Sequence, residues 1–389
     1  MSGKLSIIIP AFNEEDAIAE ILTKCLAARA PICAATGLSE VEVVAVDDGS
    51  RDKTRRIAEG FPEAKLVVHP KNRGYGQALM TGFANASGDY LSFLDADGTC
   101  DPLAFIDLYK ALEASKADMS VGNRLHAGSQ MPKIRYLGNR IYALIISVLS
   151  GVHVEDTASG MRVFSRKLLP RLAPLPNGLH FTPAMTARVV CMGARIVETP
   201  ISYAERQGES KLSVVKDGLR FLRVILGIIF AYFPLRVFGP IGLTFLVAAL
   251  ALGMKPVVFY SQFRHLQEDM IYRLLTITTL GVCGFVALAF GLISQKVSDI
   301  AVRRAPGWID ARWLREGSAA AGAALGVVGV LLNSNTILEY VSSGRIMIHW
   351  VYVLVGSLLV ISGTVLLCLG LMLGLLDHLP DAEASGRTL

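Results

Sequence analysis

The stretch Tyr90-Leu91-Ser92-Phe93-Leu94-Asp95-Ala96-Asp97 joins an apolar run to two carboxylates that are one residue apart. An apolar run of this length, ended by polar residues, is typical of a buried strand. Carboxylates this close repel each other unless they share a cation. Hard oxygen ligands suit Mg²⁺ or Mn²⁺, with substrate phosphates completing the coordination. The alternative is a polar loop in which Asp101 caps the next helix.

The segments around this stretch alternate between strand-like and helix-like patterns. The predicted strands are residues 5–9, 41–46, 66–68, 90–94 and 199–203, and the predicted helices between them are residues 14–28, 52–59 and 75–86. This alternation predicts an α/β fold, with a mostly parallel sheet and helices on both faces. Ligands of such sheets sit beyond the carboxyl ends of the strands. Because Asn13-Glu14, Asp47-Asp48 and Asp95–Asp97 each follow a strand, we expect them to converge on one crevice.

The C-terminal part of the chain is strongly apolar. It contains stretches without Asp, Glu, Lys or Arg that approach or exceed the roughly 18–20 residues of a membrane-spanning helix. The predicted spans are about 237–254, 274–295, 317–338 and 348–376. Residues 213–236 are expected to form juxtamembrane amphipathic helices, with Lys216, Arg220 and Arg223 on one side. The domains are then residues 1–212, the segment 213–236, the spans 237–376 and a tail, 377–389.

Loop charge predicts the orientation of these spans. The loop between the second and third spans holds Lys296, Arg303, Arg304, Arg312 and Arg315, whereas residues 339–345 hold one Arg. The positive-inside rule places the Arg-rich loop in the cytoplasm. No signal peptide is visible, so the N-terminal domain and the tail are expected to be cytoplasmic, as in an integral protein of the bacterial inner membrane. The net charge of +5, without a basic stripe, gives no nucleic-acid signal.

Several motifs, in this order and spacing, resemble family 2 glycosyltransferases with a GT-A fold. They are residues 8–15 (IIPAFNEE), 46–50 (VDDGS), 72–74 (NRG) followed by Gly76, 94–97 (LDAD), 156–162 (DTASGMR) and 208–212 (GESKL). The last two, with Gly122-Asn123-Arg124, resemble the polyprenyl-phosphate branch, which includes dolichol-phosphate mannose synthases and bacterial undecaprenyl-phosphate glycosyltransferases. The resemblance covers about residues 4–225. It implies a GT-A Rossmann-like nucleotide-sugar domain followed by interfacial helices and a four-helix transmembrane region.

A nucleotide-sugar donor presents a base, a ribose and a diphosphate. The predicted donor-binding residues are Pro10, Phe12, Asn13, Glu14, Asp47, Asp48, Arg73, Gly74, Asp95 and Lys211. Asp47 and Asp48 can accept hydrogen bonds from the base and ribose, although Asp-Gly-Ser is also good turn chemistry. Asp95 and Asp97 are the predicted ligands of Mg²⁺ or Mn²⁺. Gly98-Thr99 stands where many family members carry Gln after the second Asp, which leaves a third ligand open.

The predicted catalytic residues are Asp97, Asp156 and Arg206. Arg206 and Lys211 flank Gly208 and are expected to close over the donor diphosphate as a lid; the alternative is attraction to the membrane surface. Asp156 is either a general base or a residue that orients arginines. A phosphate acceptor is already ionised at neutral pH and needs no strong base, whereas a sugar hydroxyl would need one. The positioning role is therefore favoured for Asp156.

The predicted acceptor-phosphate residues are Arg124, Arg135, Asn139, Ser159 and Arg162. Arginine suits phosphate because its guanidinium donates two parallel hydrogen bonds. The neighbouring apolar residues 141–149 predict a helix that lies on the bilayer beside a prenyl chain, or else a core helix. The expected partners are a nucleotide-sugar donor, a polyprenyl phosphate, the membrane and, as an option, further copies of the chain in a homo-oligomer.

The predicted function is inverting transfer of a monosaccharide from a nucleoside-diphosphate sugar to a polyprenyl phosphate, undecaprenyl or dolichyl, at the cytoplasmic face. A processive polysaccharide synthase is the first alternative. It is disfavoured because such enzymes carry a Gln-x-x-Arg-Trp motif, and Ala311-Arg312-Trp313 has no Gln at the required place. A non-catalytic membrane scaffold is the second alternative, disfavoured because the acidic cluster is intact.

Overall fold

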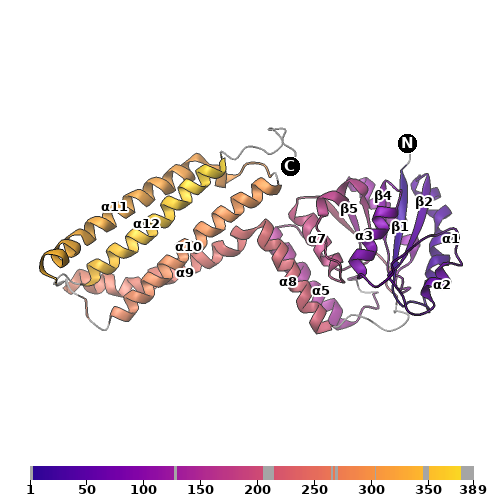
Figure 1. The fold of residues 1–389 in the computed structure, drawn as a ribbon, viewed down its shortest axis with the longest axis horizontal. Coiled ribbons are helices and arrows are strands. Elements are labelled where there is room, and N and C mark those ends of the chain that lie inside the picture. The colour runs from indigo at the N-terminus through magenta and orange to yellow at the C-terminus, as the bar shows by residue number, and fades with distance from the viewer. Residues whose placement is uncertain are drawn as a thin grey trace. The chain divides into compact units, whose positions relative to one another are not determined.

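The computed structural model describes residues 3–126, 129–204, 214–263, 266–267, 270–302, 304–344 and 350–377. It divides the chain into two compact units, Met1–Ile229 and Phe230–Leu389 (Figure 1). The boundary falls inside one helix, α8 (Val214–Tyr232). Most of α8 therefore belongs to the N-terminal unit, whereas the sequence suggested a separate segment over residues 213–236.

One seven-stranded mixed sheet forms the centre of the N-terminal unit. The strands are β1 (Lys4–Ala11), β2 (Glu40–Asp47), β3 (Lys65–Val68), β4 (Tyr90–Phe93), β5 (Met119–Asn123), β6 (Arg162–Ser165) and β7 (Ile196–Pro200). Their spatial order is β3-β2-β1-β4-β6-β5-β7, and β6 runs antiparallel to both β4 and β5 while the other neighbours are parallel. The predicted α/β class is confirmed.

Three strand predictions need correction. The last strand is β7 over Ile196–Pro200, not residues 199–203, and β5 and β6 were not predicted at all. The two missed strands have the sequences MSVGN and RVFS, which offer no continuous apolar run. They are strands because their neighbours bury them, and an isolated short segment carries no signal of that kind.

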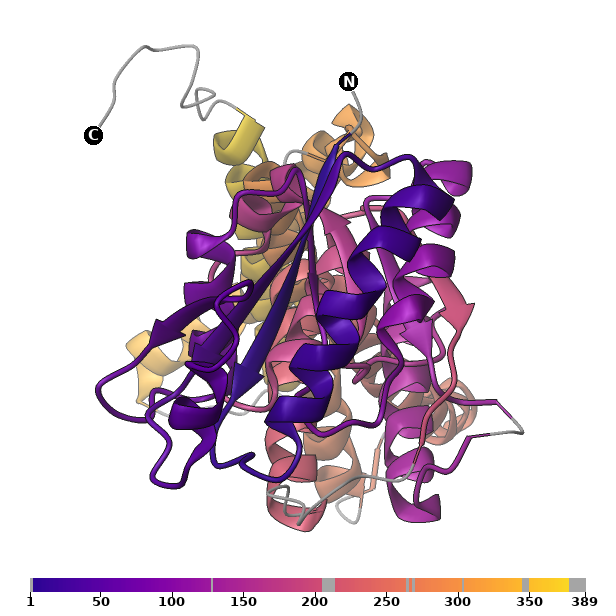
Figure 2. The ribbon, with the colours of Figure 1, turned by 90° about the vertical axis from the view of Figure 1, so that its right-hand side faces the viewer.

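Helices cover both faces of the sheet. The helices of this unit are α1 (Ile18–Thr36), α2 (Thr54–Ala58), α3 (Tyr75–Asn85), α4 (Phe105–Ser115), α5 (Lys133–Ser150), α6 (Leu169–Leu172), α7 (Phe181–Cys191) and most of α8, with 3₁₀ turns η1 (Pro102–Ala104) and η2 (Arg166–Leu168). Ile7 and Ile9 of β1 pack in one core with α1 and α4, whereas Ile8 packs in the other with α3 and α7. This alternation follows from the two-residue period of a strand, and Figure 2 shows α1 lying across one face of the sheet.

The parallel register of β1, β2 and β4 brings their carboxyl ends to one edge. Ala11 of β1 lies opposite Asp47 of β2, and Ile8 lies opposite Phe93 of β4. The backbone N–H of Asp48 then donates to Ala11 O at 2.8 Å. The acidic pairs that follow these strands are therefore held at the same edge, as the sequence predicted.

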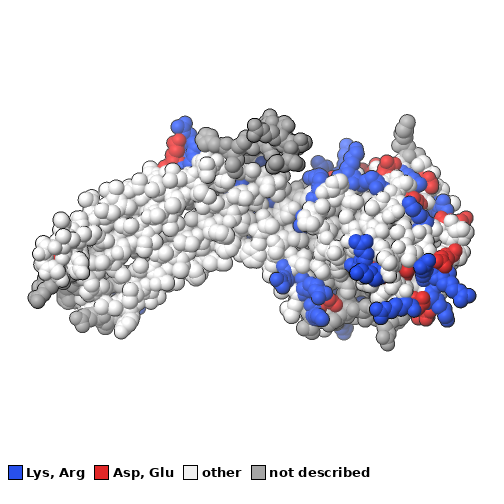
Figure 3. Space-filling model, in the orientation of Figure 1, with Lys and Arg blue, Asp and Glu red and all other residues white. Residues whose placement is uncertain are grey.

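The second unit consists of long apolar helices. They are α9 (Pro234–Phe263), α10 (Ile271–Val302), α11 (Arg312–Ser343) and α12 (Trp350–Asp377), with the 3₁₀ turn η4 (Trp308–Asp310) between α10 and α11. All four helices are long and apolar enough to cross a membrane, with mean hydropathies between 1.6 and 2.5. Figure 3 shows a face of this unit that is almost without charged residues. Charge gathers at helix ends, where the buried Lys296 pairs with Asp310 and Asp377.

Candidate active site

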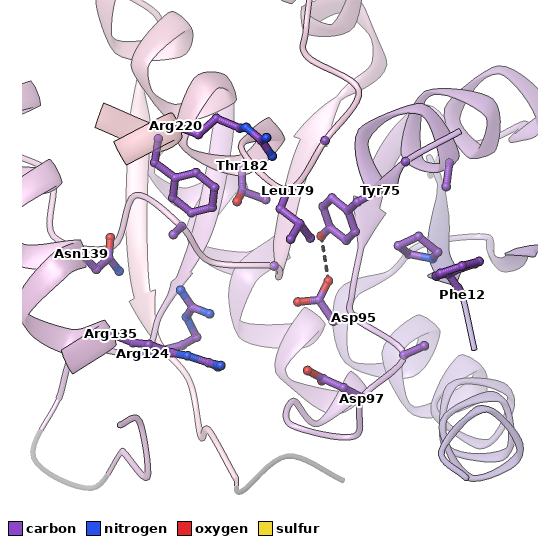
Figure 4. Close-up of a pocket in the computed structure, with 18 of the residues that line it drawn as sticks. Phe12, Tyr75, Asp95, Asp97, Arg124, Arg135, Asn139, Leu179, Thr182 and Arg220 are labelled. Atoms are coloured by element: carbon purple, nitrogen blue, oxygen red, sulfur yellow. Dashed lines mark hydrogen bonds between the residues drawn. The ribbon is translucent and has the colours of Figure 1, made fainter. Parts of the chain in front are cut away.

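A cavity of about 560 Å³ opens at the carboxyl edge of the sheet (Figure 4). The strand ends supply most of its polar lining, and α5, α7 and α8 supply the opposite wall. The predicted site residues that line it are Pro10, Phe12, Glu14, Asp48, Gly74, Asp95, Asp97, Arg124, Arg135 and Asn139. Segments that are far apart in the sequence thus meet around one space large enough for a nucleotide-sized ligand.

Other predicted residues lie behind this lining. Those that do not line the cavity are Asn13, Asp47, Arg73, Asp156, Ser159 and Arg162. Asn13 and Asp47 hold turns: Asn13 Oδ1 accepts from Arg51 N at 2.8 Å, and Asp47 Oδ1 accepts from Ser50 N at 3.3 Å. The turn alternative therefore describes Asp47 better than a direct donor contact does. Arg206 and Lys211 lie outside the described residues.

The Asp48 carboxylate holds the Arg73-Gly74 turn in place. Its carboxylate accepts from the backbone N–H of Arg73 at 2.9 Å and of Gly74 at 2.8 Å, and it contacts His69 Nδ1 at 2.7 Å. Gly74 has φ +98°, a conformation that L side chains rarely adopt, and a Cβ there would come 2.6 Å from Asn177 O. The Arg73-Gly74 motif therefore fixes the backbone conformation at the start of α3.

Hydroxyl groups contact both carboxylates of Asp95-Ala96-Asp97. Tyr75 Oη, at the start of α3, donates to Asp95 Oδ1 at 2.7 Å, and Thr99 Oγ1 donates to Asp97 Oδ1 at 2.7 Å. Burial, followed by the nearby Asp95 carboxylate, raises the pKa of Tyr75 well above its usual value, so the phenol keeps its proton and acts as donor. Tyr75 was missed in the sequence, although it stands inside the Arg73–Gly76 motif.

Asp95 also packs against the backbone of Gly160. A Cβ at Gly160 would overlap the Asp95 carboxylate. We expect Gly160→Ala to move this carboxylate and lower catalytic activity about 100-fold, because misplacing a reacting group by about 1 Å has that cost. Thermal unfolding should change little, since the clash falls on the movable end of a side chain. Gly227→Ala, whose Cβ would meet nothing within 4 Å, is the control; equal activity in both variants would contradict the expectation.

Asp156 forms a buried, doubly hydrogen-bonded pair with Arg124. Arg124 Nε donates to Oδ2 at 2.8 Å and Nη2 to Oδ1 at 2.9 Å, and Asn139 Nδ2 donates to Oδ1 at 2.7 Å. Burial alone would raise the pKa of Asp156, but Arg124 and these hydrogen bonds lower it below its usual value. A fully buried carboxylate held in this way orients Arg124 and is badly suited to act as a general base.

Ser159 and Arg162 are fully buried, which corrects the expectation that they touch an acceptor phosphate. Arg162 Nε donates to Ser159 O at 3.1 Å, and its Nη2 donates to Thr157 O at 2.9 Å. Burial lowers the pKa of this guanidinium to about 10. Arg162 therefore braces the loop that carries Asp156 and Gly160, and the spacing of the sequence motif does not distinguish such a brace from a ligand.

The wall opposite the strand ends is largely apolar. Ile134 and Tyr142 of α5 and Phe221 of α8 line it, and Tyr142 Oη donates to Gly218 O of α8 at 2.9 Å. Arg220 of α8 also faces the cavity, across from Arg124 and Arg135 (Figure 4). These α5 and α8 residues, apart from Arg135 and Asn139, were not predicted, because their helical patterns alone do not show which face meets a cavity.

The carboxylate ligands at the end of β4, Asp95 and Asp97, fit a divalent cation. Among the described residues, no group of three or more His, Cys, Asp and Glu side chains is arranged to hold a metal. Two carboxylates on one cavity wall, Asp95 and Asp97, are nonetheless the protein share that Mg²⁺ takes when phosphates and waters supply the rest.

Comparison with known proteins identifies the family. The model of glycosyl transferase family 2 matches residues 6–172. The low-salt glycan biosynthesis hexosyltransferase Agl6 of Haloferax volcanii is 30% identical over 357 residues, covering 87% of this chain and 81% of that protein. The chain belongs to glycosyl transferase family 2. The resemblance seen in the motifs is thereby confirmed, and the N-terminal unit is a GT-A-like domain of a glycosyltransferase.

The names of two further relatives of this glycosyltransferase include a polyprenyl phosphate. A dolichyl-phosphate hexose transferase of Haloferax volcanii is 32% identical over 215 residues, or 55% of this chain and 89% of that protein. An undecaprenyl-phosphate 4-deoxy-4-formamido-L-arabinose transferase of Photorhabdus laumondii is 28% identical over 304 residues, or 76% and 89%. Among solved structures, glucosyl-3-phosphoglycerate synthase of Mycobacterium tuberculosis, with Mn²⁺ and uridine diphosphate, is 20% identical with a TM-score of 0.46, covering 58% of this chain and 80% of that one.

Proposed function

We propose that this glycosyltransferase moves one sugar, with inversion, from a nucleoside-diphosphate sugar to a polyprenyl phosphate. An oxygen of the lipid phosphate attacks the anomeric carbon and forms the new C–O bond. The bond from that carbon to the donor diphosphate breaks, and its electron pair leaves with the nucleoside diphosphate. The named relatives that act on dolichyl and undecaprenyl phosphates support this choice of acceptor.

The donor is assigned to the strand-end side of the cavity. Phe12 and Pro10 offer an apolar surface for a base, and Glu14 offers a carboxylate for its N–H groups or for ribose hydroxyls, while Asp48 contributes by holding the Arg73-Gly74 turn. Asp95 and Asp97 would hold Mg²⁺ or Mn²⁺, which would neutralise charge on the departing diphosphate.

The observation that carries the acceptor assignment is the Arg124–Asp156 pair. The predicted base of the acceptor side is fully buried and has both oxygens occupied, while Arg124 and Arg135 line the cavity. An acceptor that needs deprotonation is badly served by this arrangement. An acceptor that arrives as an anion is well served, since it requires cations and no strong base. A phosphate meets both conditions.

The lipid part of the acceptor is supported by α5. Its exposed apolar residues recur at intervals of three and four, which places them on one helix face: Ile134, Leu137, Ile141, Leu144 and Val148 are between 47% and 67% exposed. Such a face is suited to the bilayer surface, as predicted for residues 141–149. With the Arg-rich segment between α10 and α11, it supports an integral membrane protein whose catalytic unit is cytoplasmic.

The test is a donor screen with purified full-length protein in detergent. The protein is incubated with Mg²⁺ or Mn²⁺, a panel of nucleoside-diphosphate sugars and undecaprenyl or dolichyl phosphate, and lipid products are identified by mass spectrometry. We expect a lipid-linked monosaccharide from at least one donor. Long polymer would favour the processive synthase instead, and absence of both products and of nucleotide binding would favour the scaffold.

A further inference from the structure

Hydroxyl donors of two different segments hold the carboxylates that face the cavity at the end of β4. Tyr75 Oη, from the start of α3, donates to Asp95 Oδ1 at 2.7 Å (dashed in Figure 4). Thr99 reaches back within the turn after β4, with its Oγ1 at 2.7 Å and its backbone N at 3.2 Å from Asp97 Oδ1. Each carboxylate thus has one oxygen oriented by a specific hydroxyl.

The backbone around Tyr75 is fixed on both sides. Gly74 N donates to Asp48 Oδ2 at 2.8 Å, and Gly76 N donates to Asn177 O at 2.7 Å. A Cβ at Gly76 would overlap Pro176 O, so the chain passes there without room for a side chain. Because neighbouring atoms hold its backbone, the Tyr75 phenol reaches Asp95 from a fixed base rather than from a mobile loop.

Thr99 is equally well seated. It is 3% exposed, and it follows Gly98, whose φ of +74° turns the chain back toward Asp97. Thr99 is thus well placed to orient Asp97. The sequence alone had left open whether Gly98-Thr99 alters metal or donor binding.

We propose that Tyr75 and Thr99 are positioning residues for a divalent metal bound with the donor diphosphate. Their hydroxyls keep Asp95 and Asp97 in the rotamers in which both carboxylates line the cavity. A ligand side chain that is oriented before binding loses less rotational freedom when the ion arrives, and removal of such supporting partners typically weakens metal binding 10- to 100-fold. The inference rests on the proposed function only in taking a metal and a diphosphate as the ligand.

The experiment measures Mn²⁺ binding by electron paramagnetic resonance with the full-length protein. Uridine or guanosine diphosphate is present, whichever the wild type binds more tightly. Tyr75→Phe and Thr99→Val keep the side-chain shape and remove the hydroxyl. We expect each to raise the Kd for Mn²⁺ about 10-fold or more. Sugar transfer in both variants should return to within a few-fold of wild type at saturating Mn²⁺.

Two controls separate positioning from folding. Tyr90→Phe removes the same kind of bond, from Tyr90 Oη to Glu113 Oε1 at 2.9 Å, but outside the cavity, and should leave the Kd unchanged. Thr99→Ser retains the hydroxyl and should restore Mn²⁺ affinity toward that of the wild type. Wild-type Kd values in both Tyr75→Phe and Thr99→Val would overturn the proposal, as would a wild type that binds no Mn²⁺ with either nucleotide.

Failure of this inference differs from failure of the proposed function. A wild type that binds Mn²⁺ with nucleotide, and weakens in both variants, but glycosylates no polyprenyl phosphate, would refute the acceptor and leave the positioning role intact. If the wild type makes the lipid-linked sugar but the Kd for Mn²⁺ is unchanged in both variants, the positioning role is refuted and the proposed function stands.

Discussion

Replacing Asp97 by asparagine should lower sugar transfer at least about 10³-fold. The divalent cation that neutralises the leaving diphosphate would lose a carboxylate ligand of the protein. The asparagine keeps the shape of the side chain and an oxygen that can accept from Thr99, so the turn after β4 should persist. The measurement is the initial rate of lipid-linked sugar formation over a range of Mg²⁺ and Mn²⁺ concentrations.

A matched control is available on the neighbouring helix. Asp107 of α4 is an exposed carboxylate away from the cavity lining, and Asp107→Asn should be as active as the wild type. Excess metal should not rescue Asp97→Asn fully, since the ligand is gone rather than misplaced. Full activity of Asp97→Asn at ordinary metal concentrations would refute both the metal assignment and the proposed mechanism.

The strand-end side of the cavity, to which the donor is assigned, was better predicted from the sequence than the side assigned to the acceptor. Asp48, Asp95 and Asp97 follow apolar runs, and parallel strands bring such ends together whatever else the chain does. Residues 156–162 do not follow a strand end. Within them the side chains of Asp156, Ser159 and Arg162 are fully buried and hold neighbouring residues in place. Burial separates such a supporting residue from a ligand, and the sequence motif does not show burial.

Tertiary context also decided the features that were missed. The short strands β5 and β6 form between buried neighbours, and β6 reverses the direction of the sheet beside β4. Tyr75 belongs to a recognised motif, but its partner Asp95 is 20 residues away, and no local pattern links the two. The apolar helices α9 to α12, in contrast, were visible because length and composition alone mark them.

The largest effect on stability should come from Asp156→Ala. This change leaves the guanidinium of Arg124, which is 9% exposed, without its two carboxylate bonds, and it also removes acceptors for Arg124 N and Asn139 Nδ2. Breaking a buried pair from one side costs about 3–5 kcal/mol, because the remaining charge is left uncompensated. Transfer should fall as well, with a raised KM for the lipid phosphate, since Arg124 would no longer be held at the cavity wall.

Glu59→Ala provides the contrast, because it breaks the Arg55–Glu59 pair, whose side chains are 58% and 50% exposed. An exposed pair of this kind contributes less than about 1 kcal/mol. Unfolding of both variants should be compared at pH 7. The lowered pKa of Asp156 means that its contribution is present above the ordinary aspartate pKa, about 3.9, and is lost as the pH falls through the folded-state value. If Asp156→Ala were as stable as Glu59→Ala and retained the wild-type KM for polyprenyl phosphate, Asp156 would be neither the brace of Arg124 nor part of the acceptor site.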